Sequence, residues 1–152
     1  MTIELINADI VAAHLLAIPQ KIRVAVETKA VREASKVIVG QFRQNAPVET
    51  GALQKSLKFD VRKYRGGNIV VGLIGADNDF VGTVERNKKG KKVFKRNQNA
   101  TANRRRPSKY LHLVNLGTKR GVPALHFKEK TEEQVAGQVQ QILTNAVQEA
   151  LR

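Results

Sequence analysis

The chain has 152 residues and a formal net charge of +14, and it contains no cysteine. Its length fits one domain with a single core, so we expect residues 1–152 to form one domain. The composition excludes a disulfide framework, a thiolate metal site and a cysteine nucleophile, and no apolar run approaches the ~18 residues of a membrane span.

Apolar residues recur at helical spacing from Pro19 to Asn45, which predicts a long amphipathic helix. Pro19 suits its first turn, and Pro47 marks its end because a proline disfavours helical geometry in the preceding residue. A shorter helix is expected before it, over residues 9–17. At the amino terminus no basic region precedes an apolar stretch, so no standard secretion signal is expected.

The pattern changes to period two from Ser56, where Leu57, Phe59 and Val61 share one face of a half-buried strand. Residues 65–68 contain two glycines that accept turn geometry, and residues 69–74 form an apolar run typical of a return strand. The two runs therefore predict an antiparallel hairpin.

A basic arm is predicted over residues 80–109. Residues 80–86 and 92–96 are compatible with a second, polar hairpin around residues 88–90. Residues 97–106 have almost no apolar content, so we expect them to be mobile in the isolated protein.

Two helices are expected in the last third of the chain. The first begins at Pro107, with Tyr110, Leu113 and Val114 facing inward and Gly117 as a left-handed C-terminal cap. The second covers roughly residues 128–151. The predicted class is α+β: a long N-terminal helix, a central sheet based on an antiparallel hairpin, a short helix, a long C-terminal helix, and the basic arm as an extended loop or hairpin.

Most of the positive charge lies in the basic arm: from Arg86 to Lys109 there are eleven basic and no acidic residues, which leaves about +3 for the rest of the chain. Three alternatives stay open for it: a solvated loop, docking on an acidic protein ring, or contact with DNA. Between those bases Phe94 is the only aromatic residue, which favours sequence-independent contact with phosphate or carboxylate over stacking on bases. The candidate contact residues are Arg86, Lys88, Lys89, Lys91, Lys92, Lys95, Arg96, Arg104, Arg105, Arg106 and Lys109.

Other candidate sites have simpler interpretations. His14, His112 and His126 are isolated from one another in sequence, and a structural role is the simplest one for them. Asp77 and Asp79 could bind a cation or act in acid–base chemistry, but an Asx-rich turn is the simpler alternative. The common motifs of hydrolases, nucleotide-binding enzymes and metalloproteases are absent, so we expect no catalytic residue, no metal and no cofactor.

Two sequence cassettes carry a resemblance to a known family. Cassette 1 is the run from Ala46 to Leu53 that closes on Ser56, and cassette 2 is the run from Tyr110 to Thr118, followed by Pro123, Ala124 and Phe127. In these cassettes the chain resembles the tail-completion, or neck, proteins of long-tailed bacteriophages, including the minor tail protein Z group of lambda-like phages. The motif residues are Pro47, Thr50, Gly51, Leu53, Ser56, Tyr110, Gly117, Thr118 and Pro123.

The resemblance implies a structural virion protein, not an enzyme, that forms a ring of six subunits at the neck or head-proximal tail end after assembly in the host cytoplasm. Implied partners are connector or head-closure proteins and tail terminator or tube proteins, with no membrane and with possible contact to genomic DNA. The alternative is a DNA-binding protein that uses the basic arm as a phosphate clamp. Asn115 and His126 depart from the family pattern, which commonly has an acid and a proline there.

Overall fold

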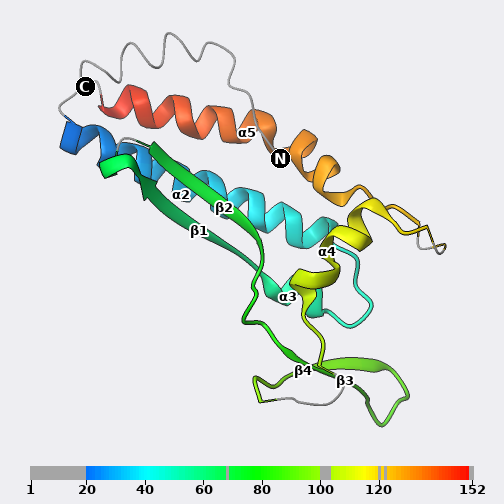
Figure 1. Cartoon of the computed structure of the whole chain (residues 1–152). Coiled ribbons are helices and arrows are strands. Elements are labelled where there is room, and N and C mark those ends of the chain that lie inside the picture. The colour runs from blue at the N-terminus through cyan, green and yellow to red at the C-terminus, as the bar shows by residue number, and fades with distance from the viewer. Residues whose placement is uncertain (1–19, 68, 100–103, 120, 122, 151–152) are drawn as a thin grey trace. The chain divides into compact units, whose positions relative to one another are not determined.

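The computed structural model describes residues 20–67, 69–99, 104–119, 121 and 123–150 (Figure 1). Pro19, the helix expected over residues 9–17 and His14 lie outside these residues. The described elements are helices and two small two-stranded antiparallel sheets, which confirms the α+β class. Contacts divide the chain into two compact units, a first unit of residues 1–41, 59–74 and 131–152 and a second unit of residues 42–58 and 75–130.

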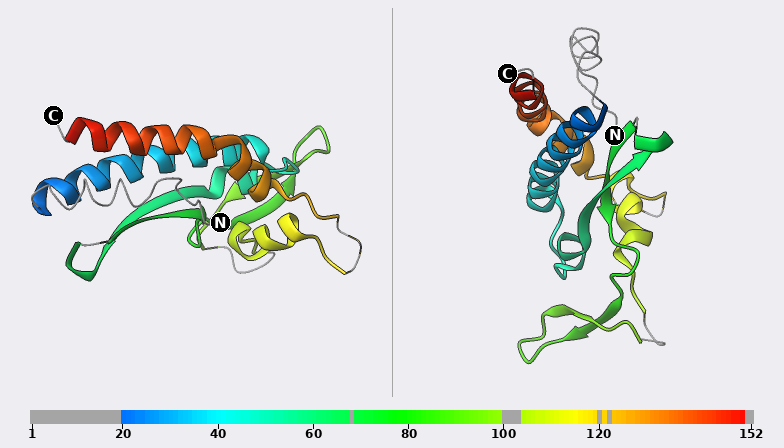
Figure 2. Two further views of the ribbon diagram at one scale, coloured as in Figure 1. Left: turned by 90° about the horizontal axis from the view of Figure 1, so that it is seen from above. Right: turned by 90° about the vertical axis from the view of Figure 1, so that its left-hand side faces the viewer.

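In the first unit the long helices α2 (Gln20–Asn45) and α5 (Phe127–Ala150) run side by side (Figure 2). Ala34 and Ile38 of α2 form a buried cluster with Val135 and Val139 of α5, and Ile74 of the hairpin packs against it. Both helices match the predicted bounds within about two residues, because each carries a long apolar stripe at helical spacing.

The predicted hairpin is formed by β1 (Leu57–Tyr64) and β2 (Ile69–Ala76), joined by a tight turn at Arg65–Gly67. Gly66 adopts a φ of 67°, which suits a residue without a Cβ atom. Gly72 lets β2 approach α2 closely, because a Cβ atom there would lie 2.5 Å from Ser35 Oγ and 3.2 Å from a methyl group of Val31. The absence of a side chain at Gly72 therefore allows the hairpin to pack closely against the helix.

Two helical glycines offer a test of the first unit. Gly40 lies in α2 and Gly137 in α5, and a Cβ atom at either would meet no atom within 4 Å. Replacing each by alanine is expected to raise the free energy of unfolding by about 0.5–1 kcal/mol, since glycine costs about that much in a helix interior. Urea unfolding of the two single variants and the double variant measures the gain. A loss of stability in all three would contradict this description of the helices.

In the second unit, cassette 1 leads into a short helix, α3 (Ala52–Ser56), which the sequence did not predict. Gly51 precedes α3 with a φ of 70° and a ψ of 0°, so it starts this helix and does not reverse the chain directly into β1. α3 packs against α4 (Pro107–Leu116), and Phe42 stacks on Phe127 with ring centroids 5.3 Å apart.

The inward face of α4 differs from the predicted one. Leu113 is 42% exposed, whereas Pro107, Leu111 and Asn115 are buried at successive turns of the helix. Gly117 is the C-cap of α4 and has a positive φ of 75°, but its ψ of −177° lies outside the left-handed helical region, so the predicted left-handed cap is wrong. Among the described helices, none is long and apolar enough to cross a lipid bilayer.

Candidate functional site

The basic arm folds as the second hairpin that the sequence allowed. β3 (Gly82–Arg86) pairs with β4 (Lys92–Arg96) in antiparallel register. At the tip, the Asn87 side-chain oxygen accepts hydrogen bonds from the backbone N–H groups of Lys89 (3.0 Å) and Lys91 (2.9 Å). This side chain closes the turn and so fixes where the tip lysines leave the backbone.

The segment after β4 returns to the hairpin and pairs with it. The backbone N–H of Arg105 donates to the Gly82 carbonyl oxygen (2.8 Å), and the Gly82 N–H donates to the Arg105 carbonyl oxygen (3.2 Å). Arg105 therefore has fixed backbone partners, which the polar composition of residues 97–106 did not predict. The pairing places Arg105 beside the start of β3.

A small aromatic cluster packs the base of the arm. Phe80 and Phe94 stack with centroids 5.3 Å apart, and the Arg96 guanidinium lies 5.5 Å from the centre of the Phe80 ring. Phe94 is only 6% exposed. The single aromatic residue among the candidate bases is thus used for packing, so it is not available to stack on nucleotides.

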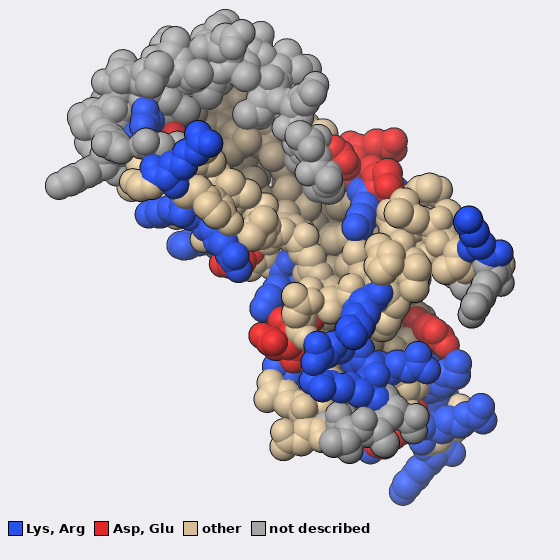
Figure 3. Space-filling view, viewed as in Figure 1, with Lys and Arg blue, Asp and Glu red and all other residues tan. Residues whose placement is uncertain are grey.

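The candidate bases of the arm face solvent, except Arg106, which is half-buried. Figure 3 shows this side of the molecule with lysine and arginine in blue. Two of the bases form ion pairs with carboxylates: Lys95 with Glu85 at 2.6 Å and Lys92 with Glu49 at 2.8 Å. The arm therefore displays a largely uncompensated positive surface.

Both cassettes meet the arm at one pocket of about 630 Å³, which lies within the second unit. Cassette 1 supplies one wall, cassette 2 and a residue after it supply the second, and the arm supplies the third. The lining residues are Pro47, Glu49, Thr50, Gly51, Ala52, Leu53, Tyr110, Val114, Leu125, Val84, Lys92 and Arg105. In the sequence the arm and the cassettes are separate features, and no local pattern predicts this pocket.

The charged groups of the pocket influence one another. The hydrogen bond from Lys92 and the positive charges of Lys92 and Arg105 lower the pKa of the Glu49 carboxyl, so Glu49 is ionised at neutral pH. Burial raises the pKa of the Tyr110 hydroxyl, which stays neutral. The pocket thus combines two cations, one carboxylate and an apolar floor.

Most motif residues of the cassettes have structural roles. Leu53 and Ser56 are buried, and the Ser56 hydroxyl donates to the Leu53 carbonyl oxygen at 2.8 Å. The Thr118 carbonyl oxygen accepts a hydrogen bond from the backbone N–H of Gly121 at 3.2 Å, whereas Pro123 is exposed. Tyr110 is the motif residue of cassette 2 that reaches the pocket.

Asn115 joins α4 to the start of α5. Its side-chain oxygen accepts a hydrogen bond from the Lys128 backbone N–H at 2.9 Å, and its amide nitrogen lies 3.0 and 3.1 Å from the two Glu129 carboxylate oxygens. A hydrogen bond from its own backbone N–H, and then the one from the Asn115 amide, lower the pKa of the Glu129 carboxyl. The departure from the family's acid therefore gives Glu129 a hydrogen-bond donor that an ionised acid would not supply.

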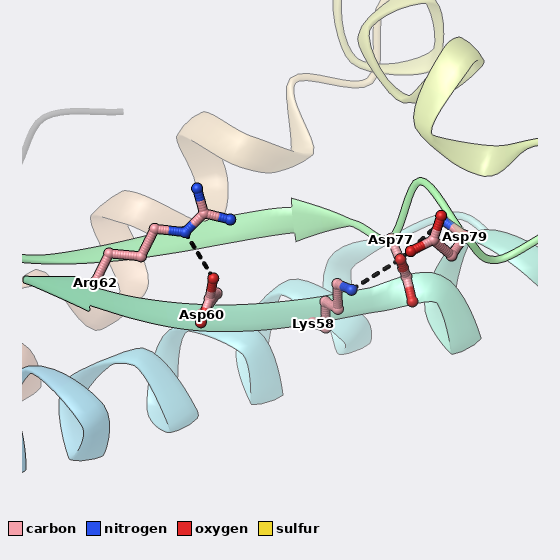
Figure 4. A network of polar contacts seen from close by, with 5 residues as sticks. All are labelled: Lys58, Asp60, Arg62, Asp77 and Asp79. Carbon is pink, nitrogen blue, oxygen red and sulfur yellow. Dashed lines mark hydrogen bonds and ion pairs between the residues drawn. The ribbon is translucent and has the colours of Figure 1, made fainter.

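The acidic pair at residues 77–79 forms a turn (Figure 4). The Asp77 carboxylate accepts a hydrogen bond from Lys58 Nζ at 2.8 Å and another from the backbone N–H of Asp79 at 2.9 Å. Within the described part of the chain, no group of three histidine, cysteine or acidic residues is placed to hold a metal ion. His112 and His126 are exposed.

The ion pair of Asp77 predicts a pH-dependent contribution to stability. The hydrogen bond from Lys58 and then that from Asp79 lower the pKa of Asp77 in the folded state, so its contribution is present above the ordinary value of 3.8 and is lost as pH falls through the folded pKa. Asp77→Asn is expected to cost about 0.5–1 kcal/mol at pH 7, because Lys58 is largely exposed, and to cost nothing near pH 2.

Asp79→Asn is the matched control, because the backbone of Asp79, not its carboxylate, makes the turn's hydrogen bond. Urea unfolding at both pH values measures the two variants. Equal stabilities for them at pH 7 would show that the Lys58–Asp77 pair contributes nothing.

One comparison with known proteins gives a match. The chain matches the model of the HK97-gp10-like family, described as "Bacteriophage HK97-gp10, putative tail-component", over residues 11–117. Searches of curated proteins and of solved structures gave no match. The matched region includes cassette 1, the whole basic arm and α4.

Proposed function

Because the chain belongs to the HK97-gp10-like family of bacteriophage tail components, and is thus a structural part of the virion, we propose that it completes the head-proximal end of the tail. It assembles there as a closed ring, with six subunits as the expected number, and helps to join the tail to the DNA-filled head. Its neighbours are connector or head-closure proteins on one side and tail terminator or tube proteins on the other.

The observation that carries this proposal is the basic arm, which presents exposed cations on a folded hairpin in a protein of a tail family. A rigid, positively charged hairpin suits docking on an acidic surface of a neighbouring subunit, because charge complementarity sets register and speeds association. Such a protein acts by binding its neighbours during assembly, and it does not catalyse a reaction.

A closed ring needs two different interfaces on each subunit, because its contacts are heterologous. The arm with its pocket supplies one candidate. The hairpin β1–β2 supplies the other, since Tyr64, Ile69 and Leu73 are each more than 40% exposed. Large apolar side chains exposed together on a small hairpin are typical of a surface that becomes covered.

Electron microscopy of assembled particles tests the location, and light scattering of the purified protein tests the ring. The expected result is a ring at the neck whose arms contact the adjacent protein. A protein that stays monomeric both alone and with its tail and connector partners, and that never occurs in particles, would overturn the proposal.

A second function, sequence-independent contact with the genome, is favoured by the lack of acidic residues between Arg86 and Lys109. Binding to DNA through about six phosphates would give a slope near −5 in a plot of log affinity against log salt concentration. A shallow slope together with tight, partner-specific binding to protein would exclude this function for the arm.

A further inference from the structure

The pocket between the cassettes and the basic arm has an apolar floor that is open to solvent. Leu53 is buried and Val114 half-buried, whereas Leu125 is 48% exposed and Val84 36% exposed. Its volume of about 630 Å³ lies within the ~300–1,000 Å³ of typical ligand sites. An open groove of this size suits a few residues of a chain segment better than an enclosed small molecule.

The charges of the pocket leave one cation available for a ligand. Lys92 is paired with the Glu49 carboxylate at 2.8 Å. The Arg105 side chain has no hydrogen bond to any described residue, although its charge acts on Glu49 and Tyr110. A guanidinium offers two parallel N–H groups that match a carboxylate, so the pocket can take one carboxylate beside its apolar floor.

The same groups disfavour nucleic acid in the pocket. A nucleic-acid strand would bring successive phosphates past the ionised Glu49, whereas a peptide with a single acidic group meets only Arg105. The two arm phenylalanines are stacked on each other, so neither is free to stack on a base.

We infer that this pocket binds an acidic segment of a neighbouring tail protein, which inserts one apolar side chain against Val114 and Leu125 and pairs one carboxylate with Arg105. The inference rests on the proposed role in tail assembly, and it gives the two cassettes a binding role where they meet the arm. The backbone of the arm already fixes Arg105 through Gly82, so recognition requires little rearrangement.

A binding experiment on the purified chain tests the inference without requiring a ring. The probe is a blocked peptide with one aspartate between leucines, compared with peptides in which this aspartate is replaced by asparagine or lysine. Nitrogen-15 chemical shifts locate the binding. The expected result is that the aspartate peptide binds most tightly and shifts the amides of Gly51, Val84 and Val114.

Matched variants separate the two parts of the recognition. Arg105→Gln is expected to weaken binding of the aspartate peptide by about three- to tenfold, whereas Arg104→Gln, one residue away and outside the pocket lining, leaves it unchanged. Leu125→Ser is expected to weaken all peptides, and Leu116→Ser, a more exposed leucine outside the lining, none.

Three outcomes would overturn the inference: equal binding of the three peptides, unchanged binding by Arg105→Gln, or stronger shifts of the pocket amides by an oligonucleotide than by the aspartate peptide. None of these depends on whether the protein reaches the neck. A protein that binds the peptide but never forms a ring would instead overturn the proposed function and leave the pocket assignment in place.

Discussion

Replacing Asn115 by alanine is expected to lower the free energy of unfolding by about 2–3 kcal/mol. Asn115 is 2% exposed, and its side chain caps the Lys128 N–H and donates to Glu129, so its removal leaves a partly buried N–H without its partner and opens a small cavity. Loss of a helix cap costs about 1 kcal/mol, and an unsatisfied buried group about 1–3 kcal/mol. Urea unfolding followed by circular dichroism measures the loss.

Asn145→Ala in α5 is the matched control, because it makes the same change of residue type at an exposed helical position. Its expected effect is neutral or slightly stabilising, since alanine is the better helix former. If both variants unfolded at the same urea concentration, Asn115 would not join α4 to α5 as described.

Asn115→Asp tests the two roles of the Asn115 side chain separately: accepting a hydrogen bond from the Lys128 N–H, and donating one to the Glu129 carboxylate. An aspartate keeps the acceptor for the Lys128 N–H but places a second carboxylate about 3 Å from that of Glu129. Repulsion raises the pKa of the new group, so this variant is expected to be destabilised at pH 7 and to recover toward the parent as pH falls below about 5. A variant whose deficit does not change with pH would show that charge repulsion is not the cause.

The two long helices and β1 could be predicted because their apolar residues recur at a regular spacing along the sequence. α2 and α5 carry apolar stripes over many turns, and β1 alternates Leu57, Phe59 and Val61 as a half-buried strand does. α3 has five residues, which is too short for a helical period to show. The inward face of α4 was misjudged because Asn115, a polar residue, occupies a buried position that hydrophobicity alone assigns to Leu113.

The site could not be predicted to the same extent, because it depends on contacts between distant parts of the chain. Each cassette was recognisable on its own, and the positive charge of the arm was evident from composition. The ion pair between Glu49 and Lys92 and the backbone pairing of Gly82 with Arg105 bring these features together, and no local pattern reports either contact. The one sequence signal for these contacts is Gly82 at the start of β3, because a glycine in a strand often marks a place where another backbone approaches closely.

Gly82→Ala is therefore expected to have a large effect on the arm. Gly82 is buried between two neighbouring backbones, paired with Arg96 in β4 and bridged to Arg105. A Cβ atom there would collide with the Lys95 carbonyl oxygen and lie 2.6 Å from the Phe94 ring. Because a backbone oxygen cannot move aside cheaply, we expect a loss of about 3 kcal/mol in the stability of the arm.

Gly75→Ala is the control for this substitution, because Gly75 is also a strand glycine and a Cβ atom there meets nothing within 4 Å. Amide hydrogen exchange measures both variants. Gly82→Ala is expected to lose protection at the amides of Gly82, Asn97 and Arg105, which bond across the base of the arm, while Gly75→Ala keeps it.

The same variant links the fold of the arm to its binding. Val84, Lys92 and Arg105 all reach the pocket from the segment that Gly82 holds together, whereas the cassette walls are built by α3 and α4. Gly82→Ala should therefore abolish binding of the aspartate peptide while leaving α3 and α4 protected from exchange. Retained binding with an unprotected arm would mean that the cassettes alone form the receptor and that Arg105 is not needed for it.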